Sequence, residues 1–365
     1  MQFDVAAYIW PSYHDDPRSR IFWPQCFGEW QSVLSARPKF EGHVEPRLPV
    51  WGPVNEADPY VMSMEIDAAA DHGVNTFIYD WYWYDDRPFL EGCLNEGFLK
   101  ARNNSRMKFY LMWANHNAST LWNKEISDLG ETVVWKGSIG HDEFLRVMER
   151  LTEKYFTHPL YYKIDGKPVF MIYDLGNLLS GLGGVEATRR AFEEAQAIAK
   201  NAGLPGIHFQ LTYWNANQTV STGVDGANIP TTNELVTAIG FESLTHYQFV
   251  HFTNPDRDYR EIVKDAIKEW DRIDREYAVP YYPHVSIGWD NNPRFHKFRP
   301  GVVKNNTPEA FEEALWACRD FAERKGRNLI TINSWNEWTE TSYLEPDNIY
   351  GYGYLEAVKK VFGDK

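Results

Sequence analysis

Short apolar runs alternate along the whole chain with segments in which apolar residues recur every three or four positions. The runs are rich in β-branched and aromatic side chains and lack a regular polar face, which is typical of buried strands in a parallel sheet. The segments between them have the period of amphipathic helices. The predicted strands are Phe3–Trp10, Val74–Trp83, Lys108–Asn117, Lys167–Asp174, Gly206–Asn215, Phe241–Phe249, Tyr281–Trp289 and Asn328–Trp335.

The helical segments carry start and stop signals of their own. Asp58 followed by Pro59 suits a helix cap and first helical position, and Gly73, Gly203 and Gly326 each follow the end of a segment. The predicted helices are Asp58–His72, Glu91–Asn103, Asp142–Phe156, Val185–Asn201, Thr232–Ile239, Asp256–Tyr277, Pro308–Lys325 and a terminal helix near Gly353–Phe362.

This alternation predicts an α/β fold, a (β/α)₈ TIM barrel of one domain, residues 1–365, with long loops at the C-terminal face of the strands. A doubly wound sheet is the competing α/β fold. It usually carries a glycine-rich phosphate turn after its first strand, and the sequence Tyr8-Ile-Trp-Pro-Ser-Tyr-His-Asp-Asp16 has no glycine. Because no low-complexity linker divides the chain, we expect a single domain.

Almost every predicted strand ends in polar or aromatic residues. A barrel brings these ends to one face, where aromatic rings can stack on sugars and polar groups can bind hydroxyls. Packing explains any single residue equally well, but the shared character of the ends indicates a carbohydrate site. The predicted substrate-binding residues are Tyr8, Trp10, Tyr13, His14, Asp80, Trp81, Trp83, Trp113, Asn115, His116, Asp174, Tyr213, Trp214, His246, Tyr247, Trp289, Asn333, Trp335, Asn336 and Trp338.

The last predicted strand leads into Ser334-Trp-Asn-Glu-Trp-Thr-Glu340, which places Glu337 and Glu340 three residues apart. In a strand the two side chains would point to opposite faces, whereas in a turn they share a face with Cβ atoms roughly 5–6 Å apart. Two carboxyl groups that close are what a glycoside hydrolase needs. We expect Trp335 and Trp338 to shield them from water, and Glu345 to hold the loop.

Composition excludes several other classes of function. A net charge of −14 and a pI near 5.3 argue against nucleic acid or an anionic membrane as partner, since both require a basic patch. Aromatic residues make up 16% of the chain, with 15 Trp and 21 Tyr, more than a core alone would explain. The three cysteines, Cys26, Cys93 and Cys318, are too far apart to suggest a disulfide framework or a zinc site.

We expect neither a metal nor a cofactor. Asp80 with His116, or His14 with the two aspartates after it, would be the alternative metal site, but no histidine pair has ligand spacing on one helix. There is also no Gly-x-Ser-x-Gly elbow for a serine hydrolase.

The predicted partner is an oligosaccharide or polysaccharide, and the sequence does not indicate an oligomeric state. No apolar run approaches the roughly 20 residues of a transmembrane helix. We expect a cytoplasmic protein if Met1 is the native start, and a periplasmic or secreted one if a signal peptide has been removed.

The motif Asn336-Glu-Trp-Thr-Glu340, followed by Tyr343-Leu-Glu-Pro-Asp347, resembles the WbsX-like proteins of polysaccharide gene clusters. These are related to the endo-α-mannosidases of glycoside hydrolase family 99. The resemblance covers essentially the whole chain, including Tyr8–His14 and Phe77–Trp83. It implies a (β/α)₈ barrel, in agreement with the strand count.

In the endo-α-mannosidases the motif reads Glu-Trp-His-Glu followed by Gly, so the resemblance assigns the two catalytic carboxylates to Glu337 and Glu340. It implies that the first acts as base on the sugar 2-hydroxyl, which attacks C1, while the second acts as general acid and then base. That reaction requires an α-manno configuration, as in mannose or rhamnose. Thr339 and Thr341 depart from the motif, so the endo-mannosidase specificity does not carry over. We expect Glu340, as the acid, to have the higher pKa.

Two other readings remain. WbsX-like proteins have been described as glycosyltransferases, which would need a diphosphate site, and no metal-held aspartate pair or basic cradle stands out in the sequence. A non-catalytic sugar-binding barrel would keep the aromatic rings but has no need of two close glutamates. A retaining glycoside hydrolase is therefore the favoured prediction.

Overall fold

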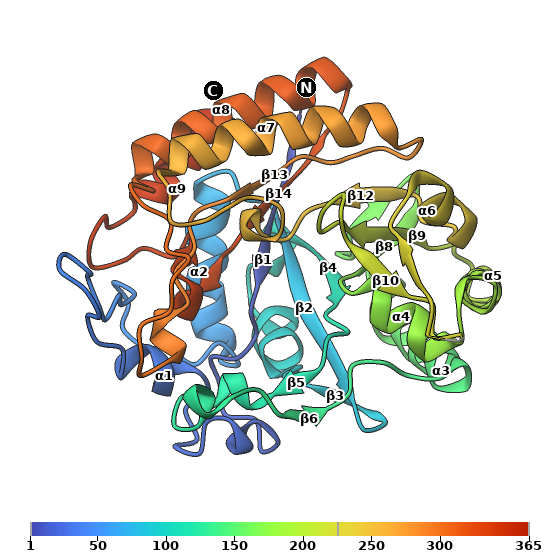
Figure 1. Ribbon diagram of the computed structural model, residues 1–365, viewed down its shortest axis with the longest axis horizontal. Helices are drawn as coiled ribbons and strands as arrows, with labels where there is room; N and C mark the ends of the chain where they lie inside the picture. The colour runs from blue at the N-terminus through green and yellow to red at the C-terminus, as the bar shows by residue number, and fades with distance from the viewer. Residues whose placement is uncertain (1, 225, 364–365) are drawn as a thin grey trace.

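The computed structural model describes residues 2–224 and 226–363 and shows a nearly closed barrel of parallel strands (Figure 1). Within those residues the strand order is β12-β9-β8-β4-β2-β1-β14-β13, and a parallel bridge from Leu244 to Tyr281 joins the two ends of that order. The (β/α)₈ prediction is confirmed. The barrel strands are β1 (Asp4–Ile9), β2 (Thr76–Tyr84), β4 (Lys108–Trp113), β8 (Lys167–Ile172), β9 (His208–Thr212), β12 (Ser243–Thr245), β13 (His284–Ser286) and β14 (Leu329–Asn333).

Strand β1 ties the two ends of the sequence together. It pairs with β2 on one side and with β14 on the other, with Asp4 opposite Leu329 and Ala6 opposite Thr76. The first and last strands of the chain are therefore neighbours, as they must be in a single closed barrel.

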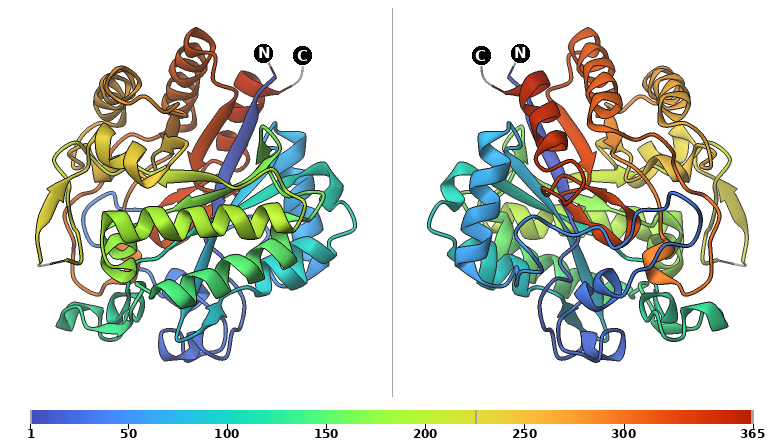
Figure 2. Two further views of the ribbon diagram at one scale, coloured as in Figure 1. Left: turned by 90° about the vertical axis from the view of Figure 1, so that its right-hand side faces the viewer. Right: turned by 90° about the vertical axis from the view of Figure 1, so that its left-hand side faces the viewer.

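Helices surround the strands, and Figure 2 shows α3 and α5 lying side by side on the outside of the barrel. The cap predicted at Asp58 is in place, since its side chain accepts a hydrogen bond from Tyr60 N, and Thr307 caps α8 in the same way by accepting one from Ala310 N. The helices are α1 (Trp30–Leu34), α2 (Pro59–Asp71), α3 (His141–Leu151), α4 (Leu175–Leu182), α5 (Val185–Asn201), α6 (Asn233–Ile239), α7 (Tyr259–Glu276), α8 (Pro308–Lys325) and α9 (Gly353–Phe362).

The prediction of an amphipathic α-helix at Glu91–Asn103 is wrong. The segment forms a π turn at Cys93–Gly97 and a 3₁₀ turn at Phe98–Lys100. A Cβ on Gly97 would lie 2.1 Å from the backbone oxygen of Glu56, so the chain passes its neighbour too closely there for any other residue. Helix α4 was not predicted; it starts at Leu175, shortly after β8 ends.

Small strands outside the barrel shape its loops. β3 (Arg87–Phe89) folds back on β2, β7 (Lys163–Ile164) pairs with β8, and β5 (Ala118–Ser119) pairs with β6 (Val133–Trp135). β10 (Thr219–Ser221) and β11 (Asn228–Pro230) form a separate hairpin. After β14, the short strands β15 (Asn336–Glu337) and β16 (Ser342–Tyr343) pair antiparallel.

Alternation along the strands decides which aromatic residues face the inside of the barrel. On β2, the indole of Trp81 donates to Glu91 (2.8 Å) and that of Trp83 to Glu143 of α3 (2.7 Å), so both point outward. Successive side chains of a strand point to opposite faces. Asp80 and Tyr82 therefore point inward, so β2 presents these two side chains, and not the tryptophans, at the mouth of the barrel.

Gly288 sets a packing limit between the end of β13 and the turn after β14. A Cβ there would lie 2.3 Å from Asn306 Nδ2 and 2.8 Å from the Thr341 backbone oxygen. We expect Gly288→Ser to lower the free energy of unfolding by about 1–3 kcal/mol, the usual cost of overpacking. Gly140→Ser is the matched control, because its Cβ meets nothing within 4 Å and serine suits its place as helix cap. Urea unfolding of both variants measures the difference, and equal stability would contradict the packing limit.

Candidate active site

A cavity of about 380 Å³ opens at the C-terminal ends of the strands. Its walls combine aromatic rings with carboxyl groups and one guanidinium, and the contributions come from strand ends all round the barrel and from two long loops. The lining residues are Trp10, Asp80, Tyr82, Met112, Ala114, His116, Leu121, Trp122, Glu131, Tyr173, Trp214, Tyr247, Arg294, Glu337 and Glu340.

The structure brings part of the predicted set together. Both glutamates lie in the cavity wall, and they are nearly buried, with 3% of Glu337 and 7% of Glu340 exposed. The predicted residues that line the cavity with them are Trp10, Asp80, His116, Trp214 and Tyr247.

The remaining predicted residues lie outside the cavity lining, and strand alternation explains several of them. Trp113 packs on Phe144 of α3, and the Tyr213 hydroxyl accepts a bond from Arg272 of α7, so both face outward, as Trp81 and Trp83 do. In the barrel interior, the Tyr8 hydroxyl donates to the His246 backbone oxygen. The predicted residues outside the lining are Tyr8, Tyr13, His14, Trp81, Trp83, Trp113, Asn115, Asp174, Tyr213, His246, Trp289, Asn333, Trp335, Asn336 and Trp338.

Polar residues of this outer group hold the loops together. Asn115 accepts from Asp174 N and donates to Asp174 O, both at 2.7 Å, while the Asp174 side chain caps α4. Asn333 accepts a bond from Gln248 (2.9 Å). These side chains fix the frame around the cavity, which a sequence pattern cannot distinguish from sugar binding.

Sequence reasoning missed other lining residues. Tyr82 follows Asp80 by two positions, and Met112 and Ala114 precede His116 by four and two, so the period of a strand would have found all three. The others lie on loops or at strand ends, where no period applies. The missed residues are Tyr82, Met112, Ala114, Leu121, Trp122, Glu131, Tyr173 and Arg294.

A tight hairpin presents the two glutamates. A 3₁₀ turn at Trp338–Glu340 connects β15 to β16, and Ser334 Oγ accepts a bond from Glu337 N (2.8 Å). Glu337 ends the first short strand and Glu340 ends the turn, so both side chains reach the same cavity. We call residues 335–345 the glutamate hairpin.

Thr341 closes this turn in a left-handed conformation, with φ of 55°. Such a φ is costly for a β-branched residue and suits glycine, which is the residue that the endo-α-mannosidase motif has at this position. Here the Thr341 hydroxyl donates to the backbone oxygen of Asp290 (3.1 Å), a bond that glycine cannot make. The turn thus keeps its shape with a different residue and gains a link to the loop after β13.

One guanidinium contacts three carboxyl groups. Arg294 Nη1 lies 2.6 Å from Glu340, Nη2 lies 3.3 Å from Glu337, and Nε donates to Glu29 (3.1 Å). Glu29 is fully buried and also accepts a bond from the Trp10 indole. Because a buried charge is costly unless it is paired, this arrangement fixes Arg294 and the glutamates in one network.

The pKa values of the glutamate pair follow from these contacts. Burial raises the pKa of Glu337 well above 4.5, and the nearby charge of Glu340 raises it further. Burial also raises the pKa of Glu340, but Arg294, which is closer to this residue, opposes the rise. Because Arg294 lies closer to Glu340 than to Glu337, it favours the ionised form of Glu340 more strongly, which runs against the expectation from sequence that Glu340 has the higher pKa. Trp335 and Trp338 do not shield the pair, since both indoles donate to carboxyl groups behind the hairpin.

Tyr247 adds geometric evidence for a proton in this site. Its hydroxyl lies 3.0 Å from Asp80 Oδ2 and 2.9 Å from Glu337 Oε1. A hydroxyl has one hydrogen, so it can donate to only one of the two, and the other carboxyl group must donate to it. Burial raises the pKa of Asp80 well above its usual range, which is consistent with one shared proton here.

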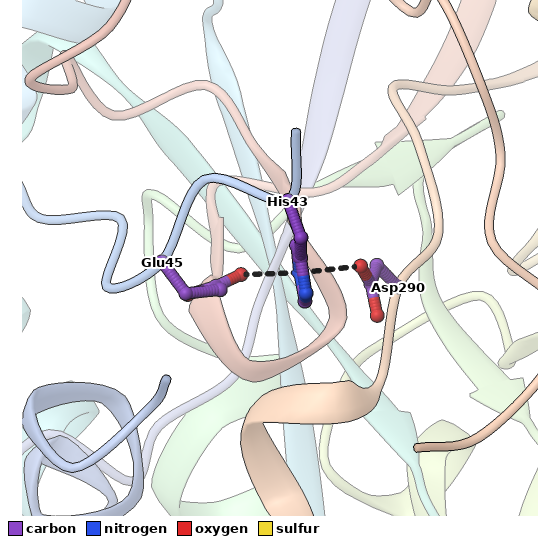
Figure 3. Close-up of side chains that lie close together, drawn as sticks. All are labelled: His43, Glu45 and Asp290. Atoms are coloured by element: carbon purple, nitrogen blue, oxygen red, sulfur yellow. Dashed lines mark ion pairs between the residues drawn. The ribbon is translucent and has the colours of Figure 1, made fainter. Parts of the chain in front are cut away.

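A second group of titratable side chains lies beside the hairpin, where His43 stands between Glu45 and Asp290 (Figure 3). His43 Nε2 is 3.0 Å from Asp290 and 3.5 Å from Glu45. Burial alone lowers the pKa of His43, but the two carboxylates outweigh it and raise that pKa to about 9.

The two carboxylates favour the charged ring, whereas the hydrogen bond from Lys39 N to the other ring nitrogen, Nδ1 (3.1 Å), forms only with the neutral ring protonated on Nε2. A charged ring would lose that bond, yet it too carries a proton on Nε2. With no lone pair on Nε2 in either form, the group fits a clamp between two loops better than a metal site.

The fold and the cavity together define the structural class of this protein. The chain is a TIM barrel whose C-terminal face holds a carboxylate pair in an aromatic cavity, and its fold is that of the family 99 glycoside hydrolases. It superposes on the endo-α-mannosidase from Bacteroides thetaiotaomicron with a TM-score of 0.62 and 12% identity, covering 98% of this chain and 95% of the other. A structure described as a glycoside hydrolase-like protein matches with a TM-score of 0.64 and 14% identity, covering 100% of this chain and 95% of the other.

The sequence identifies the family. A sequence profile described as "Glycosyltransferase WbsX" matches residues 5–358, and the chain belongs to that family. A curated relative, "Uncharacterized protein WxcX" of Xanthomonas campestris pv. campestris, is 26% identical over 98% of this chain and 49% of its own length. The chain therefore spans about half the length of the curated relatives it matches. Among the described residues, no helix is both long and apolar enough to cross a membrane.

Removing the guanidinium tests the network. Arg294→Met leaves three buried carboxyl groups unpaired, so we expect a loss of about 3–5 kcal/mol of stability. Arg294 lowers the pKa of Glu337 and Glu340, and without it their folded-state pKa values rise further above the unfolded value of 4.5. The folded state then holds protons that the unfolded state releases, so stability falls as pH rises from about 4.5 through the folded-state pKa values.

The loss should accordingly be larger near pH 8 than near pH 5, which urea unfolding at both pH values measures. Arg299→Met is the control, since Arg299 lies on the same loop but pairs with Asp128 near the surface. An equal loss at both pH values would show that Arg294 acts through packing alone.

Proposed function

We propose that this protein is a retaining glycoside hydrolase that cleaves α-manno-configured linkages, of mannose or rhamnose, in a polysaccharide or glycan. The observation that carries the proposal is the pair Glu337 and Glu340, presented by one hairpin into an aromatic cavity and bridged by Arg294. Two carboxyl groups in unequal environments are the arrangement that divides acid and base roles.

The reaction proceeds in two steps on this assignment. Glu337 takes the proton of the sugar 2-hydroxyl, O2 attacks C1, and the C1–oxygen bond to the leaving group breaks as Glu340 gives that oxygen a proton. The 1,2-anhydro sugar is then opened by a water molecule, whose proton goes to Glu340, while Glu337 returns its proton to O2. Two inversions at C1 give net retention, and O2 reaches C1 only when it lies anti to the leaving group.

The protonation of the site before substrate binds sets a condition for these acid and base roles. In the structure, Arg294 favours the ionised form of Glu340, and the shared proton lies with Glu337, Tyr247 and Asp80. For Glu340 to act as acid, bound substrate has to draw the guanidinium away and accept the hydrogen bond of the protonated carboxyl. Because the pair titrates as a unit, one proton moving within it is sufficient.

The charge of the cavity favours a hydrolase over a transferase. Asp80, Glu131, Glu337 and Glu340 line it, and Arg294, the basic residue among the lining residues, is already held by carboxyl groups. A nucleotide sugar would bring a diphosphate against this acidic wall, at a Coulombic cost in a site of low dielectric. A neutral glycan meets no such cost and can stack on the rings.

A non-catalytic sugar-binding barrel also explains the cavity less well. Close, buried carboxyl groups of raised pKa reduce stability at neutral pH, because the unfolded chain releases the protons they hold. Binding a neutral sugar needs the rings and hydroxyl partners only. Perturbed carboxyl pairs of this kind are concentrated in active sites.

Leaving-group dependence tests the roles of the two glutamates. Glu340→Gln removes the proton donor, so hydrolysis of an unactivated glycoside should fall roughly 10²–10⁴-fold. A nitrophenyl glycoside departs without protonation and should lose much less activity. Glu337→Gln should reduce both substrates alike, since the C1–O2 bond forms whatever the leaving group. The kcat/KM values of parent and variants measure this, and the opposite pattern would exchange the two roles.

A 2-deoxy substrate separates this route from a covalent one. It lacks the internal nucleophile and should not react even with the parent protein. A 2-deoxy glycoside that is hydrolysed, with a glycosyl ester on Glu337 found by mass spectrometry, would refute the anhydro-sugar route and leave the hydrolase standing. Activity that requires an added nucleotide sugar would instead support the transferase reading of the family's name.

A further inference from the structure

A second group of carboxyl groups lies behind the glutamate hairpin, outside the cavity. Glu56 precedes α2, Glu65 lies on α2, and Glu345 follows β16. One oxygen of each lies within 4.8 Å of the others, and no more than 1% of any of them is exposed. We call these three residues the rear carboxyl cluster.

Three side chains of the glutamate hairpin bind this cluster. Glu337 and Glu340 point into the cavity, whereas these three point away from it, and each donates a hydrogen bond to a different member of the cluster. The pairs are Trp335 Nε1 with Glu65 (3.1 Å), Asn336 Nδ2 with Glu56 (2.8 Å), and Trp338 Nε1 with Glu345.

The surroundings of the cluster supply no positive charge. Within the described chain, no basic side chain influences the pKa of any of the three. The other titratable groups that face them are Cys93, whose thiol donates to Glu56 (3.5 Å), Tyr79 of β2 and Tyr13, and all three are acids themselves. Three carboxylate charges this close in a buried site would repel one another strongly.

The cluster also has unmade hydrogen bonds. Oε1 of Glu65 and Oε1 of Glu345 are buried and have no hydrogen-bond partner among the residues that the structure describes. Buried carboxylate oxygens are normally paired, so each free oxygen needs a proton of its own or a neighbour's proton to accept. Protonated carboxylic acids supply those hydrogens without bringing in any further group.

We propose that Glu56, Glu65 and Glu345 are positioning residues that remain protonated at neutral pH and, as neutral acids, hold the glutamate hairpin from behind through Trp335, Asn336 and Trp338. The word positioning rests on the proposed function, because it assumes that the hairpin carries the catalytic pair. The protonation itself does not depend on that function.

Neutral acids suit every contact of the cluster. Their carbonyl oxygens can accept from the two indoles and the amide, and a hydroxyl on Glu65 and Glu345 would give each of their free oxygens a hydrogen of its own. Burial raises the pKa of Glu56 to about 8 and those of Glu65 and Glu345 well above 4.5, and mutual repulsion raises the last two further. The unfolded chain releases these protons above pH 4.5, so the cluster stabilises the fold in acid and costs stability as pH rises.

Glutamine is the neutral isostere of a protonated glutamate, so a Glu→Gln substitution distinguishes a protonated carboxyl group from an ionised one. Glu65→Gln should keep the hairpin contact, and its melting temperature should rise relative to the parent as pH goes from about 5 to about 9, because glutamine cannot ionise. Glu149→Gln, an exposed position of α3, is the control and should show no such trend. Glu65→Ala, which removes the acceptor of Trp335, should be destabilised at every pH.

Infrared difference spectra give a direct signature. The parent minus Glu65→Gln at neutral pH should show the carbonyl band of a protonated carboxyl group. If the difference shows carboxylate bands alone, or if Glu65→Gln loses stability as pH rises, the proposal is overturned. The proposal is also overturned if a chelator lowers the melting temperature of the parent, because the cluster then holds a cation. Glu345→Gln, measured in the same way, replaces Glu65→Gln should the latter not fold.

Activity enters as a separate readout. If the parent is a hydrolase, Glu65→Ala should lower kcat by up to about 10²-fold, as for a misplaced catalytic group, and Glu65→Gln should restore most of it. Equal kcat for Glu65→Ala and the parent would refute the positioning role. A parent with no hydrolase activity would refute the proposed function, while the spectra and the pH trend would still decide the protonation of the cluster.

Discussion

The cavity at the barrel mouth depends on the ion pairs between Arg294 and three buried carboxyl groups. Glu29 lies near the start of the sequence and the neighbouring pair Glu337 and Glu340 near its end, and each carboxyl group would be costly to bury alone. Arg294 brings together the loop after β1, the loop after β13 and the hairpin after β14. The same contacts make the two cavity glutamates unequal, which is the condition for dividing acid and base roles between them.

The hairpin that carries those glutamates has two faces with different electrostatics. Its front face meets a charged network around Arg294, and its back face meets the rear carboxyl cluster, where no basic group takes part. One side of the turn is thus held by ion pairs and the other by hydrogen bonds from Trp335 and its neighbours. Holding the turn from both sides limits its movement, and a carboxyl pair needs that rigidity to keep its geometry.

The sequence was sufficient for the barrel because parallel strands buried on both faces leave a strong pattern, and each of the eight predicted strands corresponds to one barrel strand. It was much weaker for the cavity. Trp81 and Trp113 looked like sugar platforms but face outward, whereas Tyr82 was missed although it follows Asp80 by one strand period. Arg294 could not be found at all, since its position is set by long-range pairing of a loop.

The proposed retaining hydrolysis is tested most directly by incubating α-mannan and α-rhamnan chains in H₂¹⁸O, without any nucleotide sugar, followed by mass spectrometry of the released ends. We expect new reducing ends that carry one ¹⁸O at C1 and are first released in the α configuration, with none from the Glu337→Gln and Glu340→Gln proteins. Release in the β configuration, or no release until a nucleotide sugar is added, would contradict it.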